Sequence, residues 1–223
     1  MRASFTTLGF MRSAIAALDH LVLGTPDLAA TAAWIEERTG VKPSPGGPHV
    51  GRGTRNVLCS LGATSYLEII GPDPDQPTPS EDRPFGVDDL TEPTMIGWAI
   101  AVPDMDVELA TSRARGYDPG PATAMQRQRP DGVMLSWMLT TPPSVTVPFL
   151  IDWGSSLHPA TTAAPGLELV ELQASHPAPG PLAETLEALG VTMGILRGQE
   201  MLVVELRGPL GTVTFPSVEF VGA

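Results

Sequence analysis

The chain has 223 residues, of which 42% are hydrophobic, and a formal net charge of −12. This length supports one large domain or two small modules with a proper core, and no apolar run approaches the roughly 18 residues of a membrane helix. The negative charge argues against nucleic acid as a partner. The one basic spot, "MQRQR" at residues 125–129, is expected to be a solvated loop. We therefore expect a soluble globular protein that binds neither nucleic acid nor a membrane.

The N-terminal stretch "MRASFTTLGFMRSAIA" covers residues 1–16. Polar residues interrupt its apolar run, whereas a secretory signal needs roughly 7 to 15 continuous apolar residues. We expect residues 1–16 to be disordered and the protein to be cytoplasmic. The single cysteine, Cys59, excludes an internal disulfide framework and a cysteine-based zinc site. Its neighbours Val57 and Leu58 favour a packed thiol.

The first predicted unit begins with residues 18–40, "LDHLVLGTPDLAATAAWIEERTG", which indicate a strand followed by a helix. Pro26 ends the strand, and Asp27 can cap the exposed N–H groups of the helix. Gly40 lies where a left-handed C-cap is expected. Strand candidates follow at 54–61 and 65–70.

The same order of elements recurs twice. Residues 95–116 run strand, Pro103-Asp104, helix and Gly116, and residues 169–190 repeat this order more loosely. Strand candidates then follow each helix, at 133–140 and 147–153 after the second and at 200–206 and 211–215 after the third.

A strand, a helix and then several strands make a βαβββ unit, which cannot cover both faces of its own sheet. We therefore expect an α+β fold in which repeated βαβββ modules pair into a curved, partly closed mixed sheet with helices outside. Proline-rich segments at 71–93 and 155–166 are predicted to link the units. The predicted single domain covers 17–223, with units at 17–71, 94–154 and, shorter, 166–216.

Three segments carry a family resemblance: "LDHLVLGTPDLAATAAWIEERTGV", "GGPHVGRGTRNVLCSLGATSYLEIIGPDP" and "VPFLIDWGSSLHPA". The chain resembles the glyoxalase-like domain family of the vicinal oxygen chelate superfamily, over roughly residues 17–215. The resemblance implies paired modules around a concave sheet. It also implies a divalent metal to which the substrate offers two adjacent oxygens, with His20 on "DHLVL" and Glu68 on "YLEII" as metal ligands.

Imidazole nitrogen and carboxylate oxygen suit Zn, Fe, Mn, Co or Ni and leave positions open for a substrate. Sites of this superfamily usually take further ligands from the paired module, and here the chain departs from the pattern. The second unit has Gly97 opposite His20 and Ile151 opposite Glu68, with Asp152 one residue out of phase. The predicted metal site therefore lacks the ligand pair of the second unit.

His49 lies in the glycine-rich segment "GGPHVGRG", whose glycines allow close backbone approach to a bound molecule. It is the candidate acid or base of catalysis, or a third metal ligand. The alternative is a loop histidine that hydrogen-bonds to backbone. His158, in "HPA", either reaches the pocket mouth or belongs to a turn.

Glu68 is a carboxylate inside an apolar run, and alternation puts it on the face of Tyr66 and Ile70. Burying an unpaired carboxylate is costly, so Glu68 needs a metal, a proton or a cation. Arg55 on the neighbouring strand is the partner that would make Glu68 a structural residue. Asn56 is a candidate contact to the ligand or to a turn.

The pocket wall around His20 is predicted to be apolar, because alternation places His20 on the face of Leu18 and Val22. Trp98 and Trp153 either fill the core or line an apolar cavity, as small-molecule sites often require. Together with Arg55 and Asn56, these two tryptophans are the predicted substrate-pocket residues.

Two functions stay open from the sequence. The first is a metal-dependent enzyme, of isomerase, lyase or dioxygenase type, in which His20 and Glu68 hold the metal and His49 moves a proton. The second is a metal-free protein that sequesters or senses an apolar small molecule, with Glu68 paired to Arg55. The intact first unit favours the enzyme, and the degenerate second unit favours the binding protein. The partner is a small molecule in both, and the superfamily resemblance adds a possible homodimer.

Overall fold

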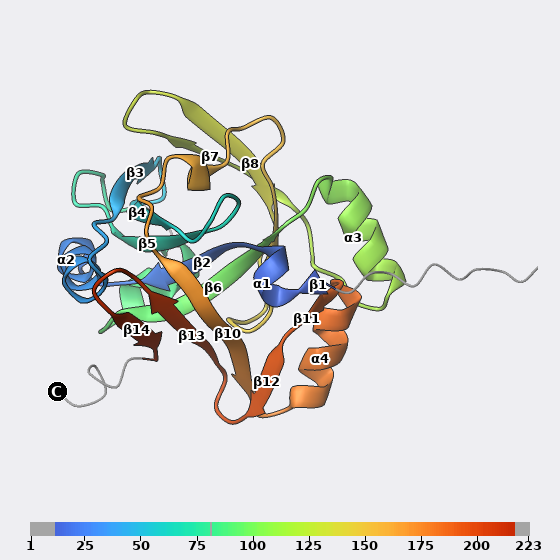
Figure 1. Ribbon diagram of the computed structural model, residues 1–223. Helices are drawn as coiled ribbons and strands as arrows, with labels where there is room; N and C mark the ends of the chain where they lie inside the picture. The colour runs from blue at the N-terminus through green and yellow to red at the C-terminus, as the bar shows by residue number, and fades with distance from the viewer. Residues whose placement is uncertain (1–11, 81, 217–223) are drawn as a thin grey trace, which may run out of the picture.

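The computed structural model describes residues 12–80 and 82–216 (Figure 1). Its helices are α1 (Ala14–Ala17), α2 (Leu28–Thr39), α3 (Met105–Ala114) and α4 (Pro179–Ala188), with short 3-10 helices η1 (Pro84–Asp89) and η2 (Pro159–Thr161). Its strands are β1 (Arg12–Ser13), β2 (Leu18–Gly24), β3 (Ser44–His49), β4 (Thr54–Ser60), β5 (Tyr66–Pro72), β6 (Thr94–Ala101), β7 (Thr123–Gln128), β8 (Met134–Leu139), β9 (Phe149–Asp152), β10 (Glu168–His176), β11 (Val191–Thr192), β12 (Gly194–Arg197), β13 (Met201–Arg207) and β14 (Thr212–Phe215).

Eight strands form one curved mixed sheet in the order β3-β4-β5-β2-β6-β9-β8-β7. The antiparallel pair β2 and β6 lies at its centre (Figure 1). Each half is a βαβββ unit in which the first strand pairs in parallel with the fourth, β2 with β5 and β6 with β9. The α+β class and the nearly closed, curved mixed sheet predicted from the sequence are confirmed.

The helix signals of the sequence act as predicted. The Asp27 side chain accepts a hydrogen bond from the Ala30 N–H at the start of α2, and Gly40 ends that helix with φ 78°. Asp104 caps α3 in the same way, through the Val107 N–H. Among the described residues, no helix is long and apolar enough to cross a membrane.

The two edge strands β3 and β7 approach each other and nearly close the sheet. A Cβ atom on Gly47, whose φ is +131°, would lie 2.4 Å from the carbonyl oxygen of Gln128. Arg127 of β7 also donates a hydrogen bond to the Gly46 carbonyl oxygen of β3. These glycines therefore permit a close approach between the two units, whereas the sequence suggested approach to a ligand.

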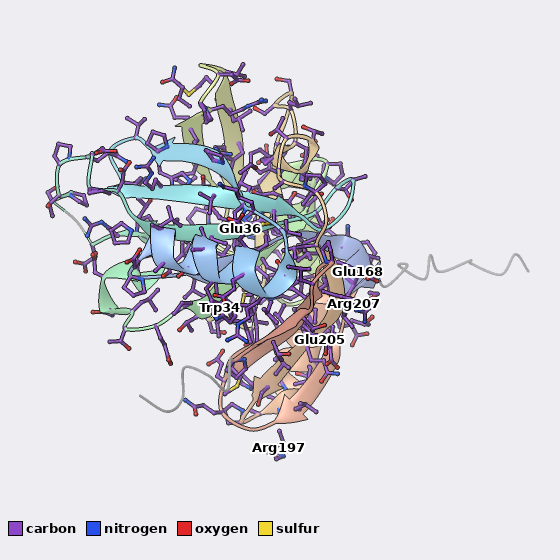
Figure 2. The ribbon with its side chains drawn as sticks, turned by 60° about the vertical axis from the view of Figure 1, so that its left-hand side comes forward. Trp34, Glu36, Glu168, Arg197, Glu205 and Arg207 are labelled. Atoms are coloured by element: carbon purple, nitrogen blue, oxygen red, sulfur yellow. The ribbon has the colours of Figure 1, made fainter. Side chains whose placement is uncertain are left out.

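The third unit differs from the other two in topology. Its sheet has the order β12-β10-β13-β14, so the first strand, β10, pairs with β12 and β13 and not with the last strand, β14. Apolar residues of this sheet share one core with the convex face of the eight-stranded sheet. Trp34 of α2 lies edge-on to Phe215 of β14, with ring centroids 6.0 Å apart, where the two sheets meet (Figure 2). The third unit therefore packs against the first two and does not extend their sheet.

The segment before β2 is ordered from residue 12. β1 pairs in parallel with β11, and Ala14 and Ala17 of α1 are buried. The disorder predicted for residues 1–16 therefore does not hold for residues 12–16, because β1 pairs with β11 of the third unit and Ala14 is buried. Residues 1–11 lie outside the described residues. Cys59 is fully buried, as predicted for a packed thiol, and burial raises its pKa to about 12.

Candidate functional site

The concave face of the eight-stranded sheet holds a cavity. The centres of water molecules can occupy about 60 Å³ of it, which corresponds to about four to six waters, so a ligand that fills it is small. The first unit supplies most of its polar side chains and the second unit most of its apolar ones. The first unit contributes the polar residues His20, His49, Arg52, Asn56, Tyr66 and Glu68, and the second contributes Arg127 and the apolar residues Met125, Trp137, Leu139, Phe149, Ile151 and Trp153.

A β-bulge at Asp19 shapes the polar half. The register of β2 against β6 shifts between Leu18 and His20, so Asp19 is an extra residue in the ladder. This lets Asp19 reach its own neighbour, and Asp19 Oδ1 accepts a hydrogen bond from His20 Nδ1 at 2.7 Å. The bulge also moves Leu18 to the main core, so only Val22 shares the concave face with His20, in contrast to the strict alternation expected from the sequence.

Asp19 is fully buried and accepts two further hydrogen bonds at Oδ2. One comes from Trp153 Nε1 at 2.9 Å and the other from His158 Nε2 at 3.0 Å. Burial alone would raise the pKa of Asp19, but the hydrogen bonds from His158 and His20 outweigh it and lower the pKa to about 2. Asp19 is therefore an ionised hub at neutral pH.

The hub fixes the protonation pattern of His20. Because Asp19 accepts from Nδ1, the Nε2 atom of His20 is free to face the cavity. The imidazole stacks on the Tyr66 ring, with centroids 4.7 Å apart, and Phe149 packs against it edge-on at 5.3 Å. The orientation of the His20 ring and its tautomer, with the proton on Nδ1, are therefore both fixed, as is typical of a histidine that acts as an acid or base.

Glu68 lies at the centre of the polar half and, as alternation predicts, shares the cavity face with Tyr66 and Ile70. Its Oε2 is 3.7 Å from His20 Nε2, and its Oε1 is 3.6 Å from His49 Nε2. The Asn56 side-chain amide donates a hydrogen bond to Oε1. Glu68 is thus a buried carboxylate surrounded by nitrogen atoms.

His49 ends strand β3 and does not lie in a loop. Its Nδ1 is 3.0 Å from the Thr54 hydroxyl, and its Nε2 is 3.3 Å from Asn56 Nδ2. An amide N–H can only donate, so Nε2 carries a lone pair and the imidazole is neutral. Burial lowers the pKa of His49, which favours the same neutral form, although Glu68 opposes this shift. Both ring nitrogens are engaged, so His49 positions Asn56.

Arg55 does not pair with Glu68. Its Nη1 lies 3.1 Å from Asp75 Oδ2 and 3.6 Å from Asp73 Oδ1, and the side chain is 42% exposed. In β4 it is Leu58 that lies opposite Glu68, so Arg55 faces away from the cavity. The predicted placement of Arg55 in the pocket is therefore wrong, and so is the structural Arg55–Glu68 pair.

Two arginines line the cavity: Arg52, which is exposed, and Arg127, which lies in the segment expected to be a solvated loop. Residues 125–128 instead belong to β7, and Arg127 is 2% exposed, with its guanidinium lining the cavity. The sequence carried a signal for a strand here, because Met125 and Arg127 alternate with Gln126 and Gln128, and in β7 the glutamines are the exposed residues. The signal was hard to recognise because the run "MQRQR" is almost entirely polar. Asp19 was also missed, because the bulge that redirects it has no sequence signature.

The second unit lines the cavity almost without donors. In the observed register Ala99 lies opposite His20, not Gly97 as predicted from the sequence. Ile151 lines the cavity as an apolar residue. Asp152 turns away to accept from the Met105 N–H of α3 at 3.1 Å. Trp98 does not line the cavity as predicted, because it alternates with Gly97 and is fully buried in the main core. Trp153 does line it.

The donors of the first unit fit a divalent metal only in part. Two imidazole nitrogens and one carboxylate are a suitable chemical set. However, His20 and His49 approach opposite oxygens of Glu68, and Asn56 Nδ2 lies between His49 and Glu68. Within residues 12–80 and 82–216, no three His, Cys, Asp or Glu side chains are arranged to hold one metal ion.

The segment predicted as a linker, residues 71–93, closes one side of the cavity. Pro84 and Phe85 of η1 line it, and the Phe85 ring lies 5.8 Å from that of Phe149. Phe85 has φ 62°, an uncommon value for a residue with a bulky side chain. This segment therefore contributes to the site as well as joining the units.

Comparison with known proteins supports the fold. The model of a family described as "Glyoxalase-like domain" matches residues 18–190. No curated protein matches the chain in sequence. A hypothetical protein from Staphylococcus aureus is similar in structure, with a TM-score of 0.61 and 14% identity over 88% of this chain and 83% of that chain.

Two methylmalonyl-CoA epimerases are more distant in structure. The enzyme from Streptomyces coelicolor, in complex with 2-nitronate-propionyl-CoA, has a TM-score of 0.42 and 19% identity over 62% of this chain and 95% of that one. The enzyme from Mycobacterium tuberculosis has a TM-score of 0.41 and 16% identity over 63% of this chain and 88% of that one.

Proposed function

The chain belongs to the glyoxalase-like domain family of the vicinal oxygen chelate superfamily, and we propose that it is an enzyme that moves a proton on a small organic substrate. The observation that carries this proposal is the Asp19–His20 pair beside Glu68. A carboxylate that orients an imidazole, with a second carboxylate 3.7 Å from the free nitrogen, gives two proton-accepting groups in one small cavity.

The reaction class is isomerisation next to a carbonyl group. His20 Nε2 takes a proton from a carbon adjacent to the carbonyl, and the electron pair of the broken C–H bond passes into the carbonyl as an enolate. The imidazolium so formed is stabilised by Asp19, which accepts from Nδ1. The protonated His20 then returns the proton to carbon or oxygen, directly or by passing it through Glu68, so atoms and electrons balance without a co-reactant.

Hydrogen exchange into solvent tests this proposal without knowledge of the product. The protein is incubated in D₂O with a panel of small 2-oxo acids and 1,2-dicarbonyl compounds, and loss of the C–H signal is followed by proton NMR. We expect catalysed exchange for at least one compound, with a decrease of about 100-fold or more in His20→Gln. His176→Gln, at a histidine outside the cavity whose Nδ1 lies 3.0 Å from the Ala178 carbonyl oxygen, is the matched control.

Binding of panel compounds without any exchange would overturn the enzyme in favour of a metal-free protein that sequesters or senses a small molecule. Exchange that persists unchanged in His20→Gln and Glu68→Gln would place the chemistry elsewhere. Loss of exchange in His176→Gln as well would show that the variants act through the fold.

A metal-assisted form of the same chemistry is the second candidate. It is favoured by the 3.7 and 3.6 Å separations of His20 Nε2 and His49 Nε2 from the Glu68 oxygens. When two ligand atoms each lie about 2.1 Å from one tetrahedral metal ion, they are about 3.4 Å from each other, which is close to these separations. His20, His49 and Glu68 would hold the ion, which would polarise a substrate carbonyl as a Lewis acid.

Metal analysis of untagged protein distinguishes the two forms. About one Zn, Fe, Mn, Co or Ni per chain in the wild type, lost in Glu68→Gln, would establish the metal-assisted form. Less than about a tenth of an equivalent after dialysis against each of these ions would remove it and leave the acid–base form.

A further inference from the structure

Arg127 is a charged residue in an unusual setting. It is 2% exposed, and burial of a cation is costly unless a counter-charge compensates it. Among the described residues, no carboxylate lies within ion-pair distance of Arg127. Burial lowers the pKa of Arg127, and the charge of Glu68 in the same cavity opposes this shift from a longer distance. Such a partner is present at Arg55, Arg83, Arg113, Arg129 and Arg207. Among the described residues, Arg52, Arg115 and Arg197 also lack one, but they are exposed to water, whereas Arg127 is buried.

The protein contact of Arg127 is a hydrogen bond from Nη1 to the Gly46 carbonyl oxygen, across the seam between β3 and β7. This bond uses one of the five N–H donors of the guanidinium and holds the group at the cavity wall. A guanidinium fixed in this way has donors left for a planar anion such as a carboxylate.

The surroundings define what else the ligand must be. Arg127 is the charged side chain that the second unit contributes to the cavity, and the other lining residues of that unit are apolar, as at Trp137 and Phe149. On the first-unit side, Arg127 lies within electrostatic range of Glu68 and His49. The enclosed space holds about four to six waters, so the part of the ligand that lies in the cavity is compact. A compact anion with an apolar part satisfies both halves of the site.

We infer that Arg127 anchors the carboxylate of the ligand, so that the protein acts on small monocarboxylic acids. That the protein turns over such an acid rests on the proposed function, whereas the binding of its carboxylate rests on Arg127 alone. With the carboxylate on Arg127, the rest of a small acid lies in the same cavity as His20 and Glu68, which face it from the first unit.

A second hollow outside the seam offers a competing position. Arg127 borders it together with Arg129 and Asp131. The charge of Arg129 is already balanced there, because its Nη2 lies 2.7 Å from Asp131 Oδ2. This makes the outer hollow the weaker place for an anion, and it makes Arg129 the matched control.

The test compares pyruvate with pyruvamide, which differ in charge but hardly in shape. Dissociation constants for both are measured by saturation-transfer NMR on the wild type, on Arg127→Met and Arg127→Lys, and on Arg129→Met. We expect the wild type to bind pyruvate at least about tenfold more tightly than pyruvamide. The preference should vanish in Arg127→Met, persist in part in Arg127→Lys and stay unchanged in Arg129→Met.

Equal binding of the two compounds by the wild type would overturn the inference, and this comparison needs no variant to fold. A preference lost in Arg129→Met but kept in Arg127→Met would move the anion to the outer hollow. Because the readout is binding, its result is independent of turnover. Pyruvate preference without hydrogen exchange would leave the anion site standing and refute the enzyme, and the converse would refute the anion site alone.

Discussion

Replacing the Asp19 carboxylate by an amide should remove a defined part of the folding free energy. Asp19 has an unfolded pKa of 3.8 and a folded pKa of about 2. At about 1.4 kcal/mol per pH unit, this difference corresponds to about 2 kcal/mol of stability at neutral pH. The source is the pair of hydrogen bonds from His158 and His20, together with the charge interactions of these two histidines, which outweigh burial. Asp19→Asn keeps the shape but loses the charge that these donors stabilise.

The pH dependence has a definite sign. The folded pKa is lowered, so between the two values the folded state binds fewer protons than the unfolded chain. The contribution is therefore fully present above about pH 4 and is lost as the pH falls towards 2. Urea unfolding followed by circular dichroism should give a wild-type free energy about 2 kcal/mol above that of Asp19→Asn at pH 7, with a smaller gap at pH 3.

Asp89→Asn, at an exposed aspartate, is the matched control and should leave the free energy of unfolding within about 0.5 kcal/mol of the wild type. Equal stability of Asp19→Asn and wild type at pH 7 would refute the reasoning. So would a gap that does not depend on pH, because the loss would then come from packing and not from the ionised carboxylate.

Two further predictions concern the seam and the buried thiol. Gly47→Ala should lower the free energy of urea unfolding by about 2 kcal/mol more than Gly51→Ala does. Both glycines have positive φ, but a Cβ at Gly51 meets nothing within 4 Å. Equal losses in the two variants would contradict the close contact between Gly47 and Gln128. Cys59, with a pKa of about 12, should react with a thiol reagent at pH 8 about 1,000-fold more slowly in native buffer than in denaturant. The reaction is monitored by absorbance, and a fast reaction of the native protein would contradict the burial of Cys59.

The fold could be predicted because its signals are local. Asp27, Asp104 and Gly40 act within one turn of the helices that they begin or end. The strands observed at 54–60 and 66–72 coincide with apolar runs of the sequence. Strand β3 escaped prediction because "SPGGPH" has the composition of a loop. Its pairing depends on β4 and on the seam with β7, which are tertiary contacts.

The sequence could predict which face of a single strand a site residue occupies, but not which residues of different strands meet in the cavity. The face of Glu68 follows from alternation along β5, whereas the partner of Glu68 depends on which strands are neighbours. Arg55 is close in sequence but faces outward, and Arg127 is distant in sequence but faces inward. Asp19 adds a further limit, because one bulged residue reverses the face that alternation assigns.

The unequal halves of the cavity bear on which chemistry the fold performs here. Two equivalent units would place equivalent ligands around a shared metal, but in the second unit Ala99 lies opposite His20 and Ile151 lines the cavity, and neither side chain is a donor. In the first unit, His20 and His49 instead have their Nδ1 atoms engaged by Asp19 and Thr54. An oriented imidazole is as useful to proton transfer as to a metal. The apolar half then has a separate role, since low polarity around His20 and Glu68 strengthens each charge interaction that the reaction creates. This division of labour favours acid–base chemistry on a small anion.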